Sequence, residues 1–194
     1  MKLATTTSNF SAFASTPAGQ LELYAKTPFR YIDLSLAHRY MTDDWESIIH
    51  DAGEAAARHG LTLIQAHAGD FIMGTLRITE LTRALRSCAK LGIPQIVVHA
   101  QWDFNIPYSS GMERFWAYNR GMYEKLFPVM EETGVKVLVE NSCESNMGAG
   151  CYFMTGAEMA DFLAWMDHPL LGAVWDTGHA NCRGNRQLPG QPPV

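Results

Sequence analysis

The sequence lacks the long hydrophobic runs, basic clusters and closely spaced cysteines that mark several large classes of protein. None of its apolar runs approaches the roughly 18 residues that a membrane span needs, and residues 1–7 lack the apolar core of a secretory signal. The 15 basic and 20 acidic residues give a formal charge of −5 without a Lys/Arg run, which argues against a nucleic-acid partner. We therefore expect a cytoplasmic protein with no membrane contact.

The cysteines exclude a further class of fold. They show neither the short paired spacing nor the density of a disulfide-stabilised secreted domain. The chain has four of them, Cys88, Cys143, Cys151 and Cys182, which we expect to be reduced thiols.

The chain does contain a regular alternation of strand-length apolar runs and helix-like patterns. Apolar residues make up 47% and charged residues 18%, which is enough for one buried core. Runs such as 96–98 and 137–139 are apolar on both faces, as in parallel strands that helices cover. Six strands are expected, near residues 2–6, 29–36, 61–66, 95–99, 135–139 and 171–175. Helices are expected near residues 16–27, 43–59, 79–91, 110–133 and 155–168, with a kink at Pro128.

This alternation predicts an α/β fold, either a doubly wound open sheet or a (β/α)8 TIM barrel. No Gly-rich phosphate loop follows the first strand, which weakens the doubly wound, nucleotide-binding version. Residues 1–181 are therefore predicted to form an incomplete TIM barrel, with about six of the eight β/α units, and residues 182–194 an irregular tail. Polar residues follow the predicted strands, at the edge where a barrel builds its active site: His38, His67, His99, Glu140 and Asp176.

Four short motifs at the predicted strand ends resemble those of the xylose isomerase-like TIM barrel superfamily. They are Gln65–Ala68, Val97–His99, Val139–Ser142 and Trp175–Asn181. The superfamily includes sugar isomerases and epimerases and, more distantly, endonuclease IV, which cuts DNA at abasic sites. The resemblance extends from the first strand to Asn181.

The resemblance implies a divalent metal site shared between two strands. In that superfamily the Glu that ends strand five and the Asp that ends strand six bind the metal, and they match Glu140 and Asp176. The His three residues after the Asp meets the substrate, or another metal in the endonuclease, and it matches His179. The remaining isomerase ligands lie on strands seven and eight, which this sequence does not reach, so we expect it to be a truncated or misread version of a longer protein.

The resemblance makes a metal-dependent sugar or sugar-phosphate isomerase or epimerase the leading functional hypothesis. Such an enzyme moves a proton or hydride next to a carbonyl, through an enediolate that the metal stabilises. Carboxylate and imidazole ligands suit Mn²⁺, Mg²⁺, Co²⁺ or Zn²⁺. The expected catalytic residues are Glu140 and His179, and the expected metal ligands are Glu140 and Asp176. The residues expected to bind a small carbohydrate are His67, His99, Asn141, Trp102 and Trp175.

Other interpretations of these residues are open at the level of the sequence. Glu140 would otherwise cap a turn or pair with a Lys, and Asp176 would form an Asx turn with Gly178. His67 and His99 would be hydrogen-bonded residues of the rim. The competing functions are a dehydratase acting on a cyclic polyol, an abasic-site endonuclease, and an inert fragment with an incomplete metal site. A homo-oligomer that pairs the open edges of the first and sixth strands is a further expectation.

Overall fold

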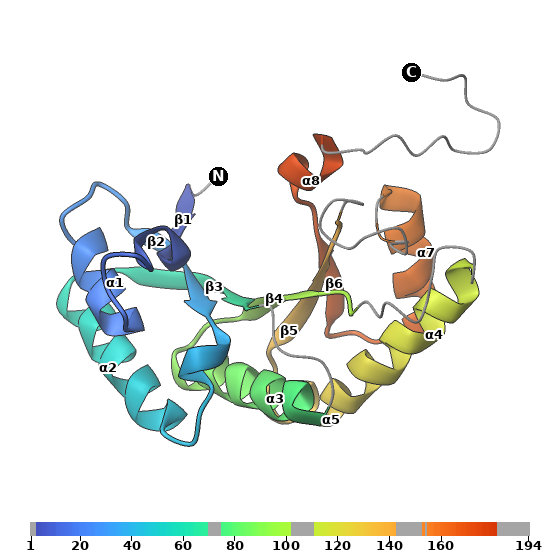
Figure 1. Ribbon diagram of the computed structural model, residues 1–194, viewed down its shortest axis with the longest axis horizontal. Coiled ribbons are helices and arrows are strands. Elements are labelled where there is room, and N and C mark those ends of the chain that lie inside the picture. Colours follow the sequence, from blue (N-terminus) through green and yellow to red (C-terminus); the bar gives the residue numbers. More distant parts are fainter. Residues whose placement is uncertain (1–2, 70–74, 102–110, 143–152, 154, 182–194) are drawn as a thin grey trace. The chain divides into compact units, whose positions relative to one another are not determined.

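The computed structural model describes residues 3–69, 75–101, 111–142, 153 and 155–181, which are built around a parallel sheet. Six strands of the described residues form this sheet, in the order β1-β2-β3-β4-β5-β6 (Figure 1). They are β1 (Ala4–Thr6), β2 (Tyr31–Leu36), β3 (Thr62–Ala68), β4 (Gln95–His99), β5 (Lys136–Glu140) and β6 (Leu171–Val174). The strand order follows the chain, as the predicted β/α alternation requires.

Helices lie between successive strands, which confirms that alternation. The α-helices of the described residues are α1 (Pro17–Tyr24), α2 (Trp45–Arg58), α3 (Thr75–Lys90), α4 (Met112–Tyr123), α5 (Phe127–Thr133), α7 (Gly156–Met166) and α8 (Thr177–Asn181). Single 3₁₀ turns are η1 (Thr7–Phe10), η2 (His38–Tyr40) and η4 (Glu124–Leu126).

The contacts divide the chain into two compact units. The first unit contains residues 1–98 and 125–138, and the second contains residues 99–124 and 139–194. Each unit has its own buried core, so each is described by itself.

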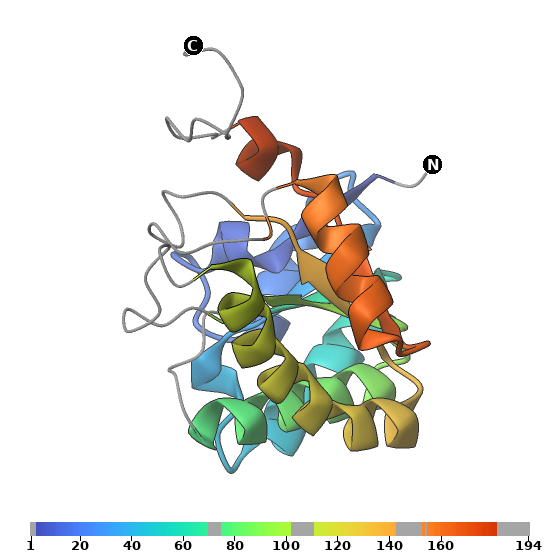
Figure 2. The ribbon, with the colours of Figure 1, turned by 90° about the vertical axis from the view of Figure 1, so that its right-hand side faces the viewer.

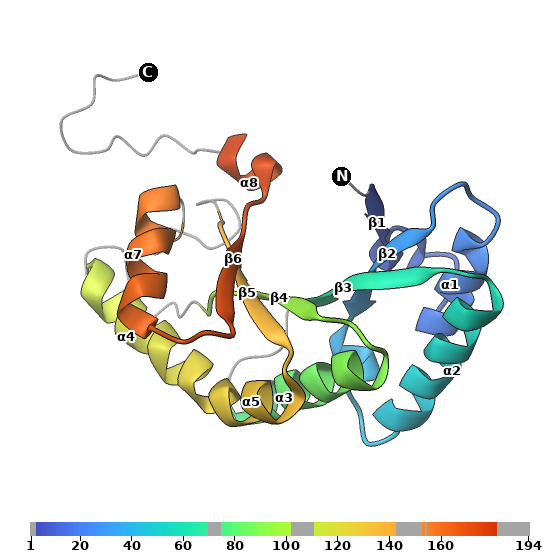
Figure 3. The ribbon, with the colours of Figure 1, turned by 180° about the vertical axis from the view of Figure 1, so that it is seen from behind.

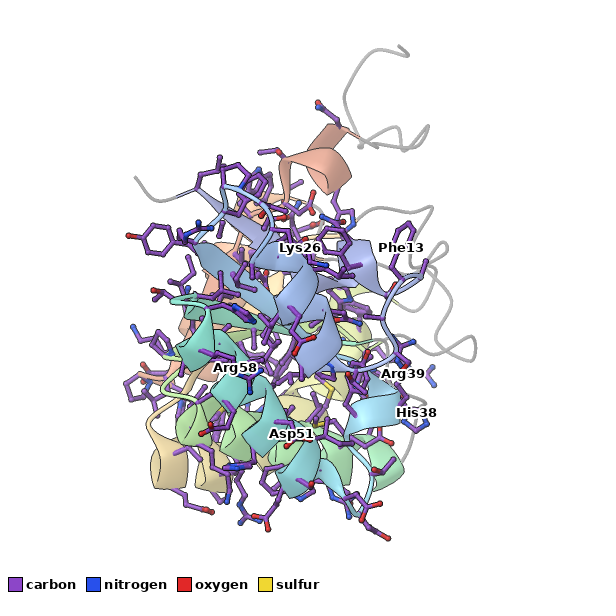
Figure 4. The ribbon with its side chains drawn as sticks, turned by 90° about the vertical axis from the view of Figure 1, so that its left-hand side faces the viewer. Phe13, Lys26, His38, Arg39, Asp51 and Arg58 are labelled. Carbon is purple, nitrogen blue, oxygen red and sulfur yellow. The ribbon has the colours of Figure 1, made fainter. Side chains whose placement is uncertain are left out.

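In the first unit, one face of the sheet is apolar and buried. On β2, the fully buried Ile32, Leu34 and Leu36 alternate with half-buried residues, as expected of a strand with one face in the core. Helices α1 and α2 lie side by side here (Figure 1). Asp51 and Arg58 are two helical turns apart on the exposed face of α2 (Figure 4).

The other face of this part of the sheet carries a row of polar side chains across three strands. Gln65 Nε2 of β3 donates to Asp33 Oδ2 of β2 over 2.9 Å. Gln95 Nε2 of β4 donates to Gln65 Oε1 over 3.1 Å. The sequence did not predict this row, because a single polar residue within an apolar strand carries no sign of its cross-strand neighbour.

Two helices differ from the prediction. Helix α3 begins at Thr75, whereas the predicted start was near Thr79. The single helix predicted over 110–133 is broken into α4, η4 and α5, with Pro128 in the first turn of α5. Pro128 has no N–H for the preceding turn, so the α-helical hydrogen-bond pattern cannot continue through it. The predicted disruption near Pro128 is therefore a single 3₁₀ turn, η4, between two α-helices.

The core of the second unit is an aromatic cluster between α4 and α7, which lie side by side (Figure 2). Phe162 of α7 is fully buried, and its ring centroid lies 4.6 Å from that of Phe153 and 5.8 Å from that of Trp116. The predicted capping box opens α7: Thr155 accepts from the backbone of Glu158, whose side chain accepts from the backbone of Thr155.

Two further expectations can be compared with the described residues. No helix among them combines the length and apolar character that a membrane crossing requires. Cys88 is a buried free thiol, as predicted. The other three cysteines and the predicted tail over 182–194 lie outside the described residues.

Candidate active site

Glu140 is the last residue of β5, and its side chain is only 5% exposed. Its Oε2 lies 2.6 Å from Nε2 of His99. Its Oε1 lies 3.4 Å from Nδ1 of His179. A buried carboxylate is costly to maintain without hydrogen-bonding partners. His99 supplies such a partner at Oε2, and His179 Nδ1 lies within ion-pair distance of Oε1.

His99 is the last residue of β4, so the end of one strand contacts the end of another. The chain just beyond His99 is held by Asn119 of α4, which is fully buried. The backbone N–H of Gln101 donates to Asn119 Oδ1 over 2.7 Å, and Asn119 Nδ2 donates to the carbonyl of Gln101 over 2.9 Å. The structure thus places His99 as a direct partner of Glu140, and its predicted contact with substrate stays a prediction.

Asp176 lies between β6 and α8, and Figure 3 shows β6 running directly into this short helix. Asp176 Oδ1 accepts from the backbone N–H of His179 over 2.8 Å, and the carbonyl of Asp176 accepts from Ala180. This is an N-cap, so the structural interpretation of Asp176 as a turn former is confirmed. A cap occupies one carboxylate oxygen and is compatible with a second function of the same side chain.

The environment of Asp176 favours its charged form. The pKa of this carboxyl lies below its usual value of 3.8, mainly because the N–H of His179 donates to it. Partial burial opposes this effect, whereas the charge of His179, the N–H of Gly178 and the side chain of Glu140 add to it. Asp176 is therefore a carboxylate at neutral pH.

The ring of His179 is oriented by its own hydrogen bonds. Nδ1 lies 2.8 Å from the carbonyl oxygen of Asn141 and faces Glu140 as well. A carbonyl oxygen only accepts hydrogen bonds, so the proton of the neutral ring must be on Nδ1. The lone pair of His179 is then at Nε2, which is the atom suited to a substrate hydroxyl.

Glu140, Asp176 and His179 together have the composition of a divalent cation site. Each offers a ligand atom, and these atoms lie within 4.8 Å of one another. All three residues belong to the second unit. Two carboxylates brought together beside an imidazole suit Mn²⁺, Mg²⁺, Co²⁺ or Zn²⁺. By the chemistry of this donor set, the residues fit the predicted cation.

The other residues predicted to bind substrate are placed differently. His67 lies on β3 in the first unit, with Nδ1 4.0 Å from Asp33 Oδ2. Trp175 is beside Asp176 and is 46% exposed, so its ring is accessible to a ligand. Trp102 lies outside the described residues.

Asn141, which was also predicted to bind substrate, is fully buried. Its side chain holds the backbone of Asp176: Asn141 Nδ2 donates to the carbonyl over 2.9 Å, and Oδ1 accepts from the N–H. The sequence predicted a substrate contact for Asn141 and gave no sign of its contact with Asp176. Its partner lies 35 positions away, so no local pattern signals the contact.

The comparisons with known proteins now decide the family. The family model described as "Xylose isomerase-like TIM barrel" matches residues 21–191. The chain belongs to this family. No curated protein gives a significant match. Membership confirms both the barrel class of the fold and the resemblance carried by the strand-end motifs.

Solved structures agree with this assignment. A 3-keto-D-glucoside 4-epimerase from E. coli has a TM-score of 0.73 and 18% identity over 96% of this chain and 72% of its own. A D-psicose 3-epimerase, solved in the presence of D-fructose, has a TM-score of 0.72 and 18% identity over 100% of this chain and 77% of its own. The IolI protein, solved with a bound zinc atom, has a TM-score of 0.70 and 19% identity over 95% of this chain and 66% of its own. At such identities the likeness establishes the fold.

Proposed function

We propose that this chain carries the metal-binding residues of a sugar or sugar-phosphate isomerase or epimerase. The observation that supports this most directly is the convergence of Glu140, Asp176 and His179 at the carboxyl ends of β5 and β6. Family membership supports it too, and two solved structures with the same fold are those of epimerases. The proposed substrate is a small carbohydrate with a carbonyl group.

Glu140 and Asp176 would hold the cation in this proposal. When bound, the cation polarises the substrate carbonyl and offsets the negative charge that develops on its oxygen. His99 restricts the carboxylate of Glu140 to one orientation through the 2.6 Å contact. The N–H groups that donate to the Asp176 carboxylate lower its pKa and favour its ionised form.

Glu140 is also the proposed base. One of its oxygens would take the proton from the carbon next to the carbonyl, while the electron pair of that C–H bond forms a C=C bond and charge moves to the carbonyl oxygen. Return of the proton by Glu140 to the neighbouring carbon gives an isomer, whereas an epimer forms when a second proton donor protonates the original carbon from the opposite face. His179 Nε2 would accept a hydrogen bond from a substrate hydroxyl.

Deuterium exchange tests this chemistry directly. The purified chain is incubated with Mn²⁺ or Co²⁺ and a panel of ketoses in D₂O, and NMR records deuterium at the carbon next to the carbonyl. Bound metal is measured separately by elemental analysis. Glu140→Gln should abolish exchange. Glu124→Gln is the matched control, because Glu124 is an exposed carboxylate paired with Arg120 and should leave exchange unchanged.

The same protein preparation separates the competing functions. Salt-dependent nicking of abasic duplex DNA, without deuterium exchange in any ketose, would favour the endonuclease. A chain with neither stoichiometric metal nor exchange would be the inert fragment, and the proposed function would be wrong.

A further inference from the structure

Asn141 directs all of its hydrogen-bonding groups except its own N–H toward two residues of the candidate site. Its side-chain amide contacts the N–H and the carbonyl of Asp176. Its backbone carbonyl accepts from Nδ1 of His179 over 2.8 Å. The side chain is fully buried.

The amide of Asn141 serves as a substitute for a neighbouring strand. β6 ends at Val174, two residues before Asp176. Backbone pairing in a sheet joins an N–H and a C=O of one strand to those of the next. A primary amide presents the same donor and acceptor. The Asn141 side chain thus holds the backbone of Asp176, beyond the last residue of β6, as a neighbouring strand would.

We propose that Asn141 is a positioning residue that sets the geometry of Asp176 and His179 relative to Glu140. Glu140 is the preceding residue in the chain, so any movement of the backbone at Asn141 is shared by the carboxylate of Glu140. A rigid amide contact to Asp176 then holds the two carboxylates at one separation. This inference rests on the proposed function, because it takes Glu140 and Asp176 as the cation ligands.

The test compares Asn141→Ala with a control that removes another buried amide. Gln20 of α1 is also a buried amide, with Nε2 donating to the carbonyl of Ala14 and to Tyr40 Oη at 3.0 Å each, and it belongs to the first unit. Gln20→Ala therefore removes a buried amide that donates two hydrogen bonds, and it leaves the residues of the site unchanged. Three quantities are measured on the full chain: Co²⁺ affinity from its visible absorption, thermal stability, and hydrogen exchange of the Asp176 amide by NMR.

The expected result is a specific loss at the site. Removing a group that orients metal ligands typically costs about 10- to 100-fold in metal affinity, and we expect that range for Asn141→Ala. The amide of Asp176 should exchange at least about tenfold faster, because its acceptor Asn141 Oδ1 is gone. Gln20→Ala should lower the melting temperature comparably and leave both site measurements close to the wild-type values.

The outcomes separate this inference from the proposed function. If Asn141→Ala is merely destabilised, like Gln20→Ala, with unchanged Co²⁺ affinity and unchanged exchange at Asp176, the positioning role is refuted. If the wild type binds no Co²⁺, the proposed metal site is wrong, and the exchange of the Asp176 amide still decides whether Asn141 orders Asp176. If Asn141→Ala does not fold, Asn141→Ser, which keeps one short polar group, is put through the same comparison.

Discussion

Nε2 of His99 and Oε2 of Glu140 lie 2.6 Å apart, at the ends of β4 and β5. The carboxylate is nearly fully buried, whereas the imidazole is 31% exposed. Solvent therefore reaches the pair at His99, whereas the buried Glu140 carboxylate needs His99 as a hydrogen-bonding partner.

A double-mutant cycle should reveal strong coupling between these two residues. His99→Ala leaves a buried carboxylate without its closest partner and should lower the free energy of unfolding by about 1 to 3 kcal/mol. In the Glu140→Ala background the same substitution should cost much less, since the carboxylate is already absent. Urea unfolding of the four proteins measures the difference.

The pair Arg58–Glu22 is the matched control for this cycle. Its atoms are 3.5 Å apart, and both side chains are more than half exposed. Exposed ion pairs are screened by water, so a cycle on Arg58 and Glu22 should give a coupling close to zero. Equal coupling in the two cycles would contradict the view that burial makes the His99–Glu140 contact strong.

Two substitutions at Asp176 should separate its cap from its charge. Asn caps helices about as well as Asp, so Asp176→Asn should keep most of the stability at neutral pH, whereas Asp176→Ala should lose about 0.5 to 2 kcal/mol. Both should bind Co²⁺ much more weakly than the wild type, because the charged ligand is lost. A normal Co²⁺ affinity in Asp176→Asn would show that Asp176 caps α8 and does not bind the cation.

The pH dependence of Asp176 follows from the direction of its pKa. The folded-state pKa lies below the usual 3.8, chiefly because the N–H of His179 donates to the carboxylate. As pH falls, the unfolded chain takes up this proton first, so the contribution of Asp176 is complete above its unfolded pKa and is lost as pH falls through the folded value. Unfolding curves between about pH 7 and pH 3 should show the stability difference between wild type and Asp176→Asn shrinking with acid.

Even the smallest side chain at position 178 should disturb the carboxylate of Asp176. A Cβ at this position would lie 3.0 Å from Asp176 Oδ1, so the carboxylate would have to move. Gly178→Ala should therefore weaken Co²⁺ binding several-fold. Gly156→Ala is the control, because a Cβ there meets nothing within 4 Å in the first turn of α7 and should leave Co²⁺ affinity unchanged. Equal affinities in the two variants would show that the Asp176 carboxylate has room to shift.

Cys88 should be an unreactive thiol in the folded protein. Burial, with a smaller contribution from the charge of Asp33, raises the pKa of this thiol far above its usual value of 9.0. Iodoacetamide should modify Cys88 only after denaturation, which peptide mass spectrometry detects. Since the folded pKa is raised, the thiol's contribution to stability is complete below about pH 9 and is lost at higher pH. Cys88→Ala should remove that alkaline loss.

The order of strands and helices was readable from the chain because it depends on local chemistry. Runs that are apolar on both faces of a strand predict parallel strands. The Thr155 capping box correctly predicted the start of α7. Glu140 and Asp176 were recognisable as site candidates for the same reason: each closes or follows an apolar strand, and parallel strands end at one edge. Pro128 was recognised as a disruption, since a missing N–H is a property of the residue itself.

The contacts that give those residues their roles were decided only by the tertiary structure. His99 meets Glu140 across 41 positions, and Asn141 meets Asp176 across 35. A hydrogen bond needs two groups within about 3 Å in a defined direction, and the separation of distant segments is set by packing of the whole fold. The strand-end pattern therefore predicts the acidic residues of the site. The roles of the buried amides of Asn119 and Asn141 depend on contacts that only the folded chain makes.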